Sequence, residues 1–170
     1  VVGPPGESDY VEGIRRLAKE TDCDVRILGP LPDREIRDLY GASDFFCLTG
    51  VPDDPSGRVE GFGLVYLEAA ACGLPSIATA IGGVSDAVVN DETGFLVPPS
   101  VNDIARAIER MVTAPDIRAR MAEHALVHAR TLSWERCAAE TYGLPHPIGR
   151  DGAATQTMND FGVPPIVRRH

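Results

Sequence analysis

Three short apolar runs, separated by segments of helical pattern, constrain the fold of this chain more than any other feature. The runs are Asp44–Leu48, Ser76–Ala78 and Phe95–Val97. Their residues do not alternate between apolar and polar, which is typical of strands that are buried on both faces. Strands of this kind, separated by helices, predict a parallel sheet with helices on both sides, so we expect a doubly wound, Rossmann-like α/β fold.

Apolar residues recur at helical spacing in the segments around these runs. The spacing of Tyr10, Ile14 and Leu17 predicts a helix from about Glu7, with Ser8 able to cap its start. Further elements are predicted in chain order: a short β run at 25–28, a helix opening at Asp33, two helices within 101–129 with Pro115 at the start of the second, and a last helix capped by Ser133 that ends near Tyr142.

Composition limits the classes of function. The chain has 170 residues, of which 44% are hydrophobic, and this suits one globular domain. A net charge of -9 argues against general affinity for nucleic acid or for an anionic membrane surface. No apolar run approaches the roughly 20 residues of a membrane helix, and the four cysteines have no paired short spacing. We expect reduced thiols, a cytoplasmic location and no nucleic-acid partner.

Both ends of the chain differ from the middle. Residues 143–170 are rich in Gly, Pro, Ala, Thr and Asn, which predicts a mobile tail after a domain over residues 1–142. Val1-Val2-Gly3 has the pattern of a buried strand running into a turn, with no preceding element to pair with it. We therefore expect the α/β domain to be incomplete at its N-terminus.

The segment Glu60–Glu68 carries the clearest chemical signal. The glycines Gly61 and Gly63 permit close backbone approach, and the helix that follows presents unpaired N–H groups and a positive dipole end. Glu68 lies about one turn inside that helix, since a turn takes roughly 3.6 residues. A carboxylate accepts hydrogen bonds from a vicinal diol, so an anion site beside Glu68 suits a nucleotide sugar.

These residues also resemble a known family. The segment Arg58–Pro75 resembles the Glu-x7-Glu segment of retaining family 4 glycosyltransferases, with their Cys-Gly-Leu-Pro exit into a strand. The resemblance covers roughly residues 1 to 142 and rests on several separated blocks, which lowers the risk of a chance match. The other blocks are Leu28–Leu31, Leu39–Asp44, Gly82–Val84, Glu92–Pro99 and Ser133–Glu135.

The resemblance implies the GT-B arrangement, in which two Rossmann-like domains face each other across a donor cleft. This chain would supply the later part of the second domain, without the N-terminal domain and without the opening strand and helix that carry a basic pair for the donor diphosphate. The family transfers a hexose with retention from a GDP- or UDP-linked donor, such as GDP-mannose, to a lipid or glycan acceptor in bacterial polysaccharide or glycolipid assembly. It implies no cofactor, and membrane contact only through the absent domain.

The family also implies roles for single residues. Glu60 resembles the catalytic residue that meets the donor sugar hydroxyls and stabilises positive charge at the anomeric carbon, and Glu68 resembles the ribose-diol acceptor. Leu31 matches the position whose backbone recognises the base. The remaining donor-binding residues act through backbone N–H groups or, for the Phe side chain, as a wall: Gly61, Phe62, Gly63, Leu64 and Val65.

Each of these residues also has an ordinary structural interpretation. Glu60 is well placed to cap a helix, and Glu68 to lie on a solvated face. The turn at Leu31 is explained equally well by chain reversal, and so is Gly82-Gly83. Adjacent acids in a Pro/Gly loop are usually solvated, so the pair Asp53-Asp54 predicts no metal site. The histidines at 124 and 128 share a helix face without a third ligand, which favours structural roles.

Two alternatives to a glycosyltransferase half remain open at this point. The first is a stand-alone nucleotide-sugar-binding module without transfer activity, since the acceptor site would lie in the missing half. The second is a flavodoxin-like signalling or flavin domain, which has the same fold class. That reading needs an acidic phosphoacceptor cluster or a phosphate loop near the start of the chain, and neither is visible in the sequence.

Overall fold

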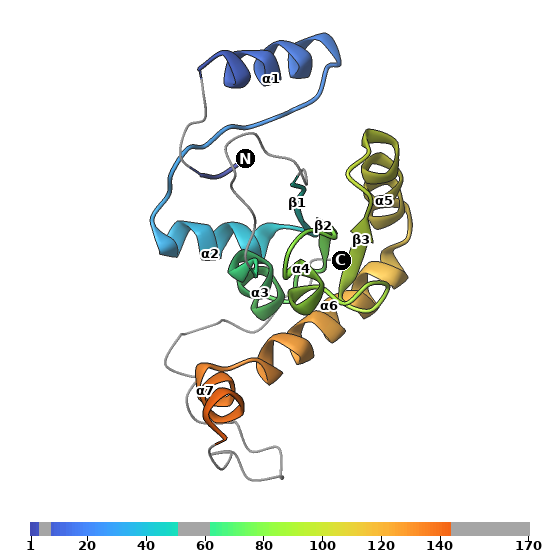
Figure 1. The fold of residues 1–170 in the computed structure, drawn as a ribbon. Coiled ribbons are helices and arrows are strands. Elements are labelled where there is room, and N and C mark those ends of the chain that lie inside the picture. Colours follow the sequence, from blue (N-terminus) through green and yellow to red (C-terminus); the bar gives the residue numbers. More distant parts are fainter. Residues whose placement is uncertain (4–7, 51–61, 144–170) are drawn as a thin grey trace. The chain divides into compact units, whose positions relative to one another are not determined.

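The computed structural model describes residues 1–3, 8–50 and 62–143. The chain forms two compact units, Val1–Ala42 and Ser43–His170, and each is described by itself. Figure 1 labels the helices and strands.

The described residues of the first unit form the helices α1 (Ser8–Glu20) and α2 (Asp33–Ala42). Its extended segments run parallel, with a bridge between Val2 and Gly29. The amide of Leu28 donates to the carbonyl of Val1 at 2.9 Å, and the amide of Gly3 donates to the carbonyl of Gly29 at 3.0 Å. The β run predicted at 25–28 forms no named strand; its last residue, Leu28, bonds to Val1 beside the isolated bridge between Val2 and Gly29.

The second unit contains a parallel three-stranded sheet of order β1-β2-β3. In one row across the sheet, Cys47 lies beside Ile77, which lies beside Phe95. The strands are β1 (Phe46–Leu48), β2 (Ser76–Thr79) and β3 (Gly94–Val97). The helices are α3 (Leu64–Ala71), α4 (Val84–Ala87), α5 (Val101–Thr113), α6 (Pro115–Thr131) and α7 (Trp134–Tyr142). The parallel α/β fold predicted from the apolar runs is confirmed.

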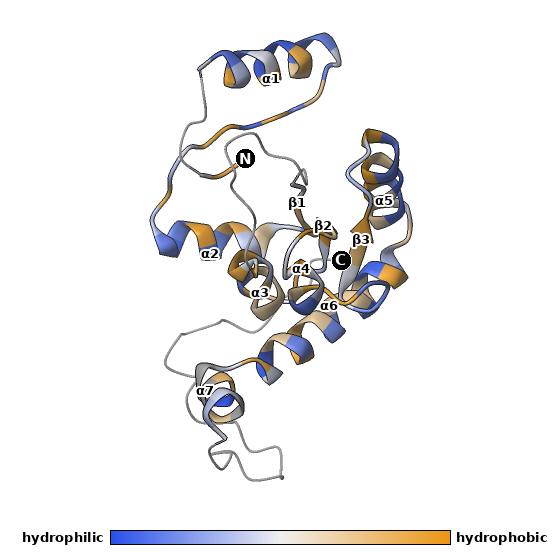
Figure 2. Cartoon of the chain, viewed as in Figure 1, coloured by the Kyte–Doolittle hydropathy of each residue, from blue (hydrophilic) through white to orange (hydrophobic). Residues whose placement is uncertain are grey.

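Helices cover both faces of this sheet. Successive side chains along a strand point to opposite sides, so apolar strand residues pack against helices on each face. Ile77 and Phe95 face a buried cluster with Met111 of α5 and Met121 of α6. Their neighbours face the opposite way, into a second cluster formed with α3 and α4. That cluster contains Tyr66, Ala78, Val84, Ala87 and Val88. Figure 2 shows the polar residues of α5 and α6 as blue bands between the apolar positions.

Local signals explain where several helices begin. Pro115 occupies the first turn of α6, and the Ser133 hydroxyl accepts a hydrogen bond from the amide of Arg136 at the start of α7, as predicted. Ser8 is the first helical residue of α1, where its hydroxyl bonds to Asp9 at 3.2 Å. The short helix α4 was not predicted, because four residues are too few to show a period.

Candidate functional site

Helix α3 begins where the sequence predicts, immediately after a glycine turn. Gly63 is its N-cap and has φ 77°, in the left-handed region that only glycine adopts readily. The amide of Tyr66 donates back to the Gly63 carbonyl at 2.9 Å and closes the first turn. The N–H groups of Leu64 and Val65 belong to this first turn and have no acceptor within the helix. The helix end therefore offers amide donors together with the positive end of its dipole.

This helix start lies at the carboxyl ends of β1 and β2. The Tyr66 hydroxyl, from the first turn of α3, donates to the Leu48 carbonyl at 2.7 Å. The amide of Gly50, two residues beyond β1, donates to the hydroxyl oxygen of Thr79 at 2.9 Å. Thr79 is the last residue of β2. The carboxyl ends of parallel strands are the edge at which open α/β sheets bind ligands, so the glycine turn stands at the expected place.

The site residues on α3 divide between an exposed and a covered face. Leu64 is 53% exposed, and Glu68 is exposed one turn further along the same face. Phe62 and Val65 are half-buried and pack against the cluster around Tyr66. The Phe62 side chain thus lies against the core, which fits a wall better than a polar contact.

The other predicted residues lie either outside the described residues or in the first unit. Glu60 and Gly61 lie outside the described residues, and so do Asp53 and Asp54. Leu31 belongs to the first unit, where it is half-buried after the left-handed Gly29.

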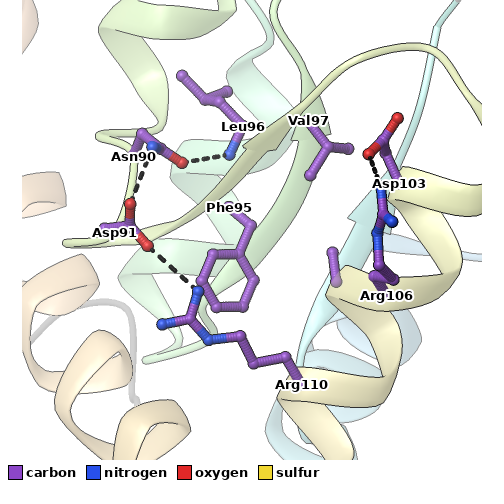
Figure 3. Close-up of a pocket in the computed structure, with 9 residues that line it drawn as sticks. Asn90, Asp91, Phe95, Leu96, Val97, Asp103, Arg106 and Arg110 are labelled. Carbon is purple, nitrogen blue, oxygen red and sulfur yellow. Dashed lines mark hydrogen bonds and ion pairs between the residues drawn. The ribbon is translucent and has the colours of Figure 1, made fainter.

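A groove of about 280 Å³ lies between β3 and α5 and contains none of the predicted site residues (Figure 3). The Arg110 guanidinium stacks 4.7 Å from the centre of the Phe95 ring and pairs with the Asp91 carboxylate at 3.6 Å. Arg106 pairs with Asp103. Each guanidinium that lines the groove therefore has a carboxylate beside it.

Hydrogen bonds beside this groove cover the outer edge of β3, the last strand of the described sheet. The amide of Leu96 on β3 donates to the Asn90 side-chain oxygen at 2.9 Å, and the amide of Asp91 donates to the Gly94 carbonyl at 2.8 Å. These bonds satisfy edge groups that would otherwise template another strand. Hydrogen bonds with Arg106, and then with Ser100, hold the pKa of Asp103 below its ordinary value. We interpret the groove as structural.

Within the described ranges, no cluster of three His, Cys, Asp or Glu side chains could hold a metal ion. The His128 ring lies 3.1 Å from the Asp86 carbonyl and joins α6 to α4, as expected of a structural histidine. The cysteines at 23, 47, 72 and 137 are free thiols. No helix in the described part of the chain has both the length and the apolar character to cross a bilayer.

Comparison with known proteins decides the family. The model of the family described as "Glycosyl transferases group 1" matches residues 1–127. The chain belongs to the group 1 glycosyl transferases. The resemblance carried by the Glu60–Glu68 segment is thus confirmed at the level of the family.

Curated relatives and solved structures agree with this assignment. The chain is 36% identical over 160 residues to the D-inositol 3-phosphate glycosyltransferase of Kribbella flavida, covering 92% of this chain and 35% of that protein. It is 44% identical over 115 residues to the enzyme of the same name from Rhodococcus erythropolis, covering 67% of this chain and 24% of that protein. The chain therefore spans about a third or less of these relatives.

Two solved structures show the same fold. HepE of Anabaena, crystallised with UDP and glucose, matches with a TM-score of 0.69 at 28% identity over 84% of this chain and 39% of HepE. Sucrose-phosphate synthase of Thermosynechococcus elongatus matches with a TM-score of 0.66 at 30% identity, over 84% of this chain and 36% of the synthase. Each match covers only a fraction of the larger enzyme, as expected for part of a glycosyltransferase.

Proposed function

We propose that this chain binds the nucleotide of a sugar donor at the start of α3, and that it serves a glycosyltransferase in which a second domain completes the site. The observation that carries the proposal is the left-handed Gly63 at the N-terminus of α3, beside the carboxyl ends of β1 and β2. A diphosphate placed there would meet first-turn amides and the positive helix end. HepE, which has the same fold, is described in complex with UDP and with UDP-glucose.

In this proposal each glutamate has its own part of the donor. Glu68 lies one turn beyond the amides, on the exposed face that it shares with Leu64, and accepts hydrogen bonds from the ribose diol. Glu60 faces the transferred sugar and stabilises the positive charge that develops at its anomeric carbon during retaining transfer. Leu31 contacts the base, while Gly61 and Gly63 let the backbone approach the phosphates and sugar.

The donor we propose is a UDP- or GDP-linked hexose, and the reaction takes place in the cytoplasm. The names of the curated relatives favour a small phosphorylated polyol as acceptor, in place of a lipid or glycan. The acceptor surface would belong to the other domain of the longer protein.

Binding can be tested by titrating the isotope-labelled chain with UDP and GDP while recording amide shifts by NMR. We expect weak binding, with shifts that centre on Gly63, Leu64 and Glu68 and leave Phe95 and Arg110 of the β3–α5 groove unchanged. Shifts centred on that groove would refute the assignment of the site. Nanomolar binding by this chain would also contradict it, because the basic pair of the family and a facing domain are not among its residues.

An assay of sugar transfer tests whether this chain needs the second domain for activity. Orientation of two substrates can contribute roughly 7 to 11 kcal/mol of barrier reduction, and in this proposal that contribution requires the acceptor surface of the second domain. We therefore expect no transfer from radiolabelled GDP-mannose or UDP-glucose to sugar, lipid or inositol phosphate acceptors by this chain alone. Transfer above the no-protein control, abolished by Glu60→Ala, would show that the chain assembles a complete site.

A further inference from the structure

A single buried hydroxyl holds both backbone groups of Gly50. Thr79 is 1% exposed and ends β2. Its oxygen accepts a hydrogen bond from the Gly50 amide at 2.9 Å, and its O–H donates to the Gly50 carbonyl at 3.0 Å. The two residues are 29 positions apart, so this contact fixes the chain leaving β1 against the end of the neighbouring strand.

A second buried hydroxyl holds the same stretch at Leu48. Tyr66 is 2% exposed, and its hydroxyl donates to the Leu48 carbonyl at 2.7 Å. Its ring meets Phe46 of β1 edge to face, with the ring centres 5.6 Å apart and the planes at 78°. Because Tyr66 stands in the first turn of α3, this contact ties the start of the helix to the end of β1.

We propose that Thr79 and Tyr66 are positioning residues for donor binding. Together they set the backbone at Leu48–Gly50 relative to the first-turn amides of α3. A diphosphate bound by backbone N–H groups depends on where the backbone lies, and neither side chain needs to touch the ligand. The inference rests on the proposed nucleotide site at α3.

The chain contains a matched control for Thr79. Thr93 is also buried, at 5% exposed. Its oxygen accepts a hydrogen bond from the Val89 amide at 2.9 Å and its O–H donates to the Val89 carbonyl at 3.5 Å. This pair lies at the amino end of β3, away from the start of α3. Thr79→Val and Thr93→Val therefore remove the same kind of bonds from equally buried sites, and only the first lies beside the proposed site.

The experiment compares Thr79→Val, Thr93→Val, Tyr66→Phe and Thr79→Ser in the full chain. Urea unfolding gives the stability of each variant, and an NMR titration with UDP and GDP gives its affinity. We expect similar shifts of the unfolding midpoint for the two valine variants. Affinity should fall about five- to tenfold in Thr79→Val, the equivalent of one lost hydrogen bond, and in Tyr66→Phe, but stay within twofold in Thr93→Val. Thr79→Ser keeps the hydroxyl and should restore binding.

Equal losses of affinity in Thr79→Val and Thr93→Val would overturn the inference, since they would reflect stability alone. Amide exchange supplies a readout without nucleotide: the Gly50 amide should exchange faster in Thr79→Val and at the parental rate in Thr93→Val. Unchanged exchange at Gly50 would also overturn it. If the parental chain bound neither nucleotide, the proposed function would fail, and the exchange rate at Gly50 would still show separately whether Thr79 fixes the backbone there.

Discussion

Replacing Gly94 by alanine should destabilise the second unit much more than replacing Gly50 by alanine. A Cβ on Gly94 would lie 2.0 Å from the Ser76 carbonyl oxygen and 2.9 Å from the Ser76 amide nitrogen. Both atoms belong to the backbone of β2, the central strand, so they cannot rotate away. To bring the Cβ–O separation to a tolerable 3 Å, β3 must move from β2 by about 1 Å. Ladder bonds near 2.9 Å would then lengthen to roughly 3.9 Å, beyond hydrogen-bonding range.

The expected cost follows from those bonds. Two or three lost ladder bonds, at about 1 kcal/mol each, with looser packing of Phe95 on Ile77, give about 3 kcal/mol. That is a large share of the roughly 5 to 15 kcal/mol that stabilises a typical domain. Urea unfolding followed by far-UV circular dichroism measures it. Gly50→Ala is the matched control, because its Cβ would meet Ile81 at 3.6 Å and Thr79 at 3.8 Å, which is ordinary contact. If the two variants unfolded within about 0.5 kcal/mol of each other, the steric argument would be refuted.

Three further changes probe the site. Glu68→Gln should leave stability within about 0.5 kcal/mol, because the residue is exposed, and weaken UDP binding by about 1 to 3 kcal/mol; Glu109→Gln on α5 should leave both stability and UDP binding unchanged, and equal losses with a 2′,3′-dideoxy nucleotide would exclude the ribose role. Gly63→Ala should cost about 1 to 2 kcal/mol in urea unfolding, because φ 77° is left-handed, and should weaken UDP binding; an unchanged midpoint would contradict that geometry. Glu60→Ala, in a longer active protein, should lower turnover with little change in UDP affinity, and the reverse pattern would exchange the roles of the two glutamates.

The sequence predicted those elements whose signal is local. Ile77 and Phe95 lie in apolar runs, and the runs became neighbouring strands of a parallel sheet with helices on both faces. Pro115 and Ser133 marked helix starts because the missing N–H of proline and the serine oxygen act within one turn of the chain. The exposed position of Glu68 on α3 fits the ordinary interpretation of that residue, a solvated face, as well as it fits the ribose role.

The contacts that organise the site could not be predicted in this way. The bond from Tyr66 to Leu48 joins residues 18 apart, and the bonds between Thr79 and Gly50 join residues 29 apart. Neither a tyrosine in an apolar helix nor a threonine at a strand end carries a local sign of its partner. The steric need for glycine at 94 is likewise set by a neighbouring strand, so the sequence shows only a glycine before an apolar run.

The salt dependence of donor binding separates the proposed site from one that has basic residues. UDP-glucose carries about two negative charges, and the chain carries a net charge of -9. If the net charge is treated as spread over a sphere of about 20 Å radius, the repulsion at its surface in water is roughly 2 kcal/mol at 0.01 M salt and roughly 1 kcal/mol at 0.15 M, where the Debye length is about 8 Å. The amides at the start of α3 act within a few ångströms and are screened much less. Raising the salt over this range should therefore tighten binding several-fold, as an NMR titration would show. A site that held the diphosphate by paired lysine or arginine side chains would lose affinity instead, so weaker binding at higher salt would mean that a cation of this chain, and not the helix end, carries the interaction.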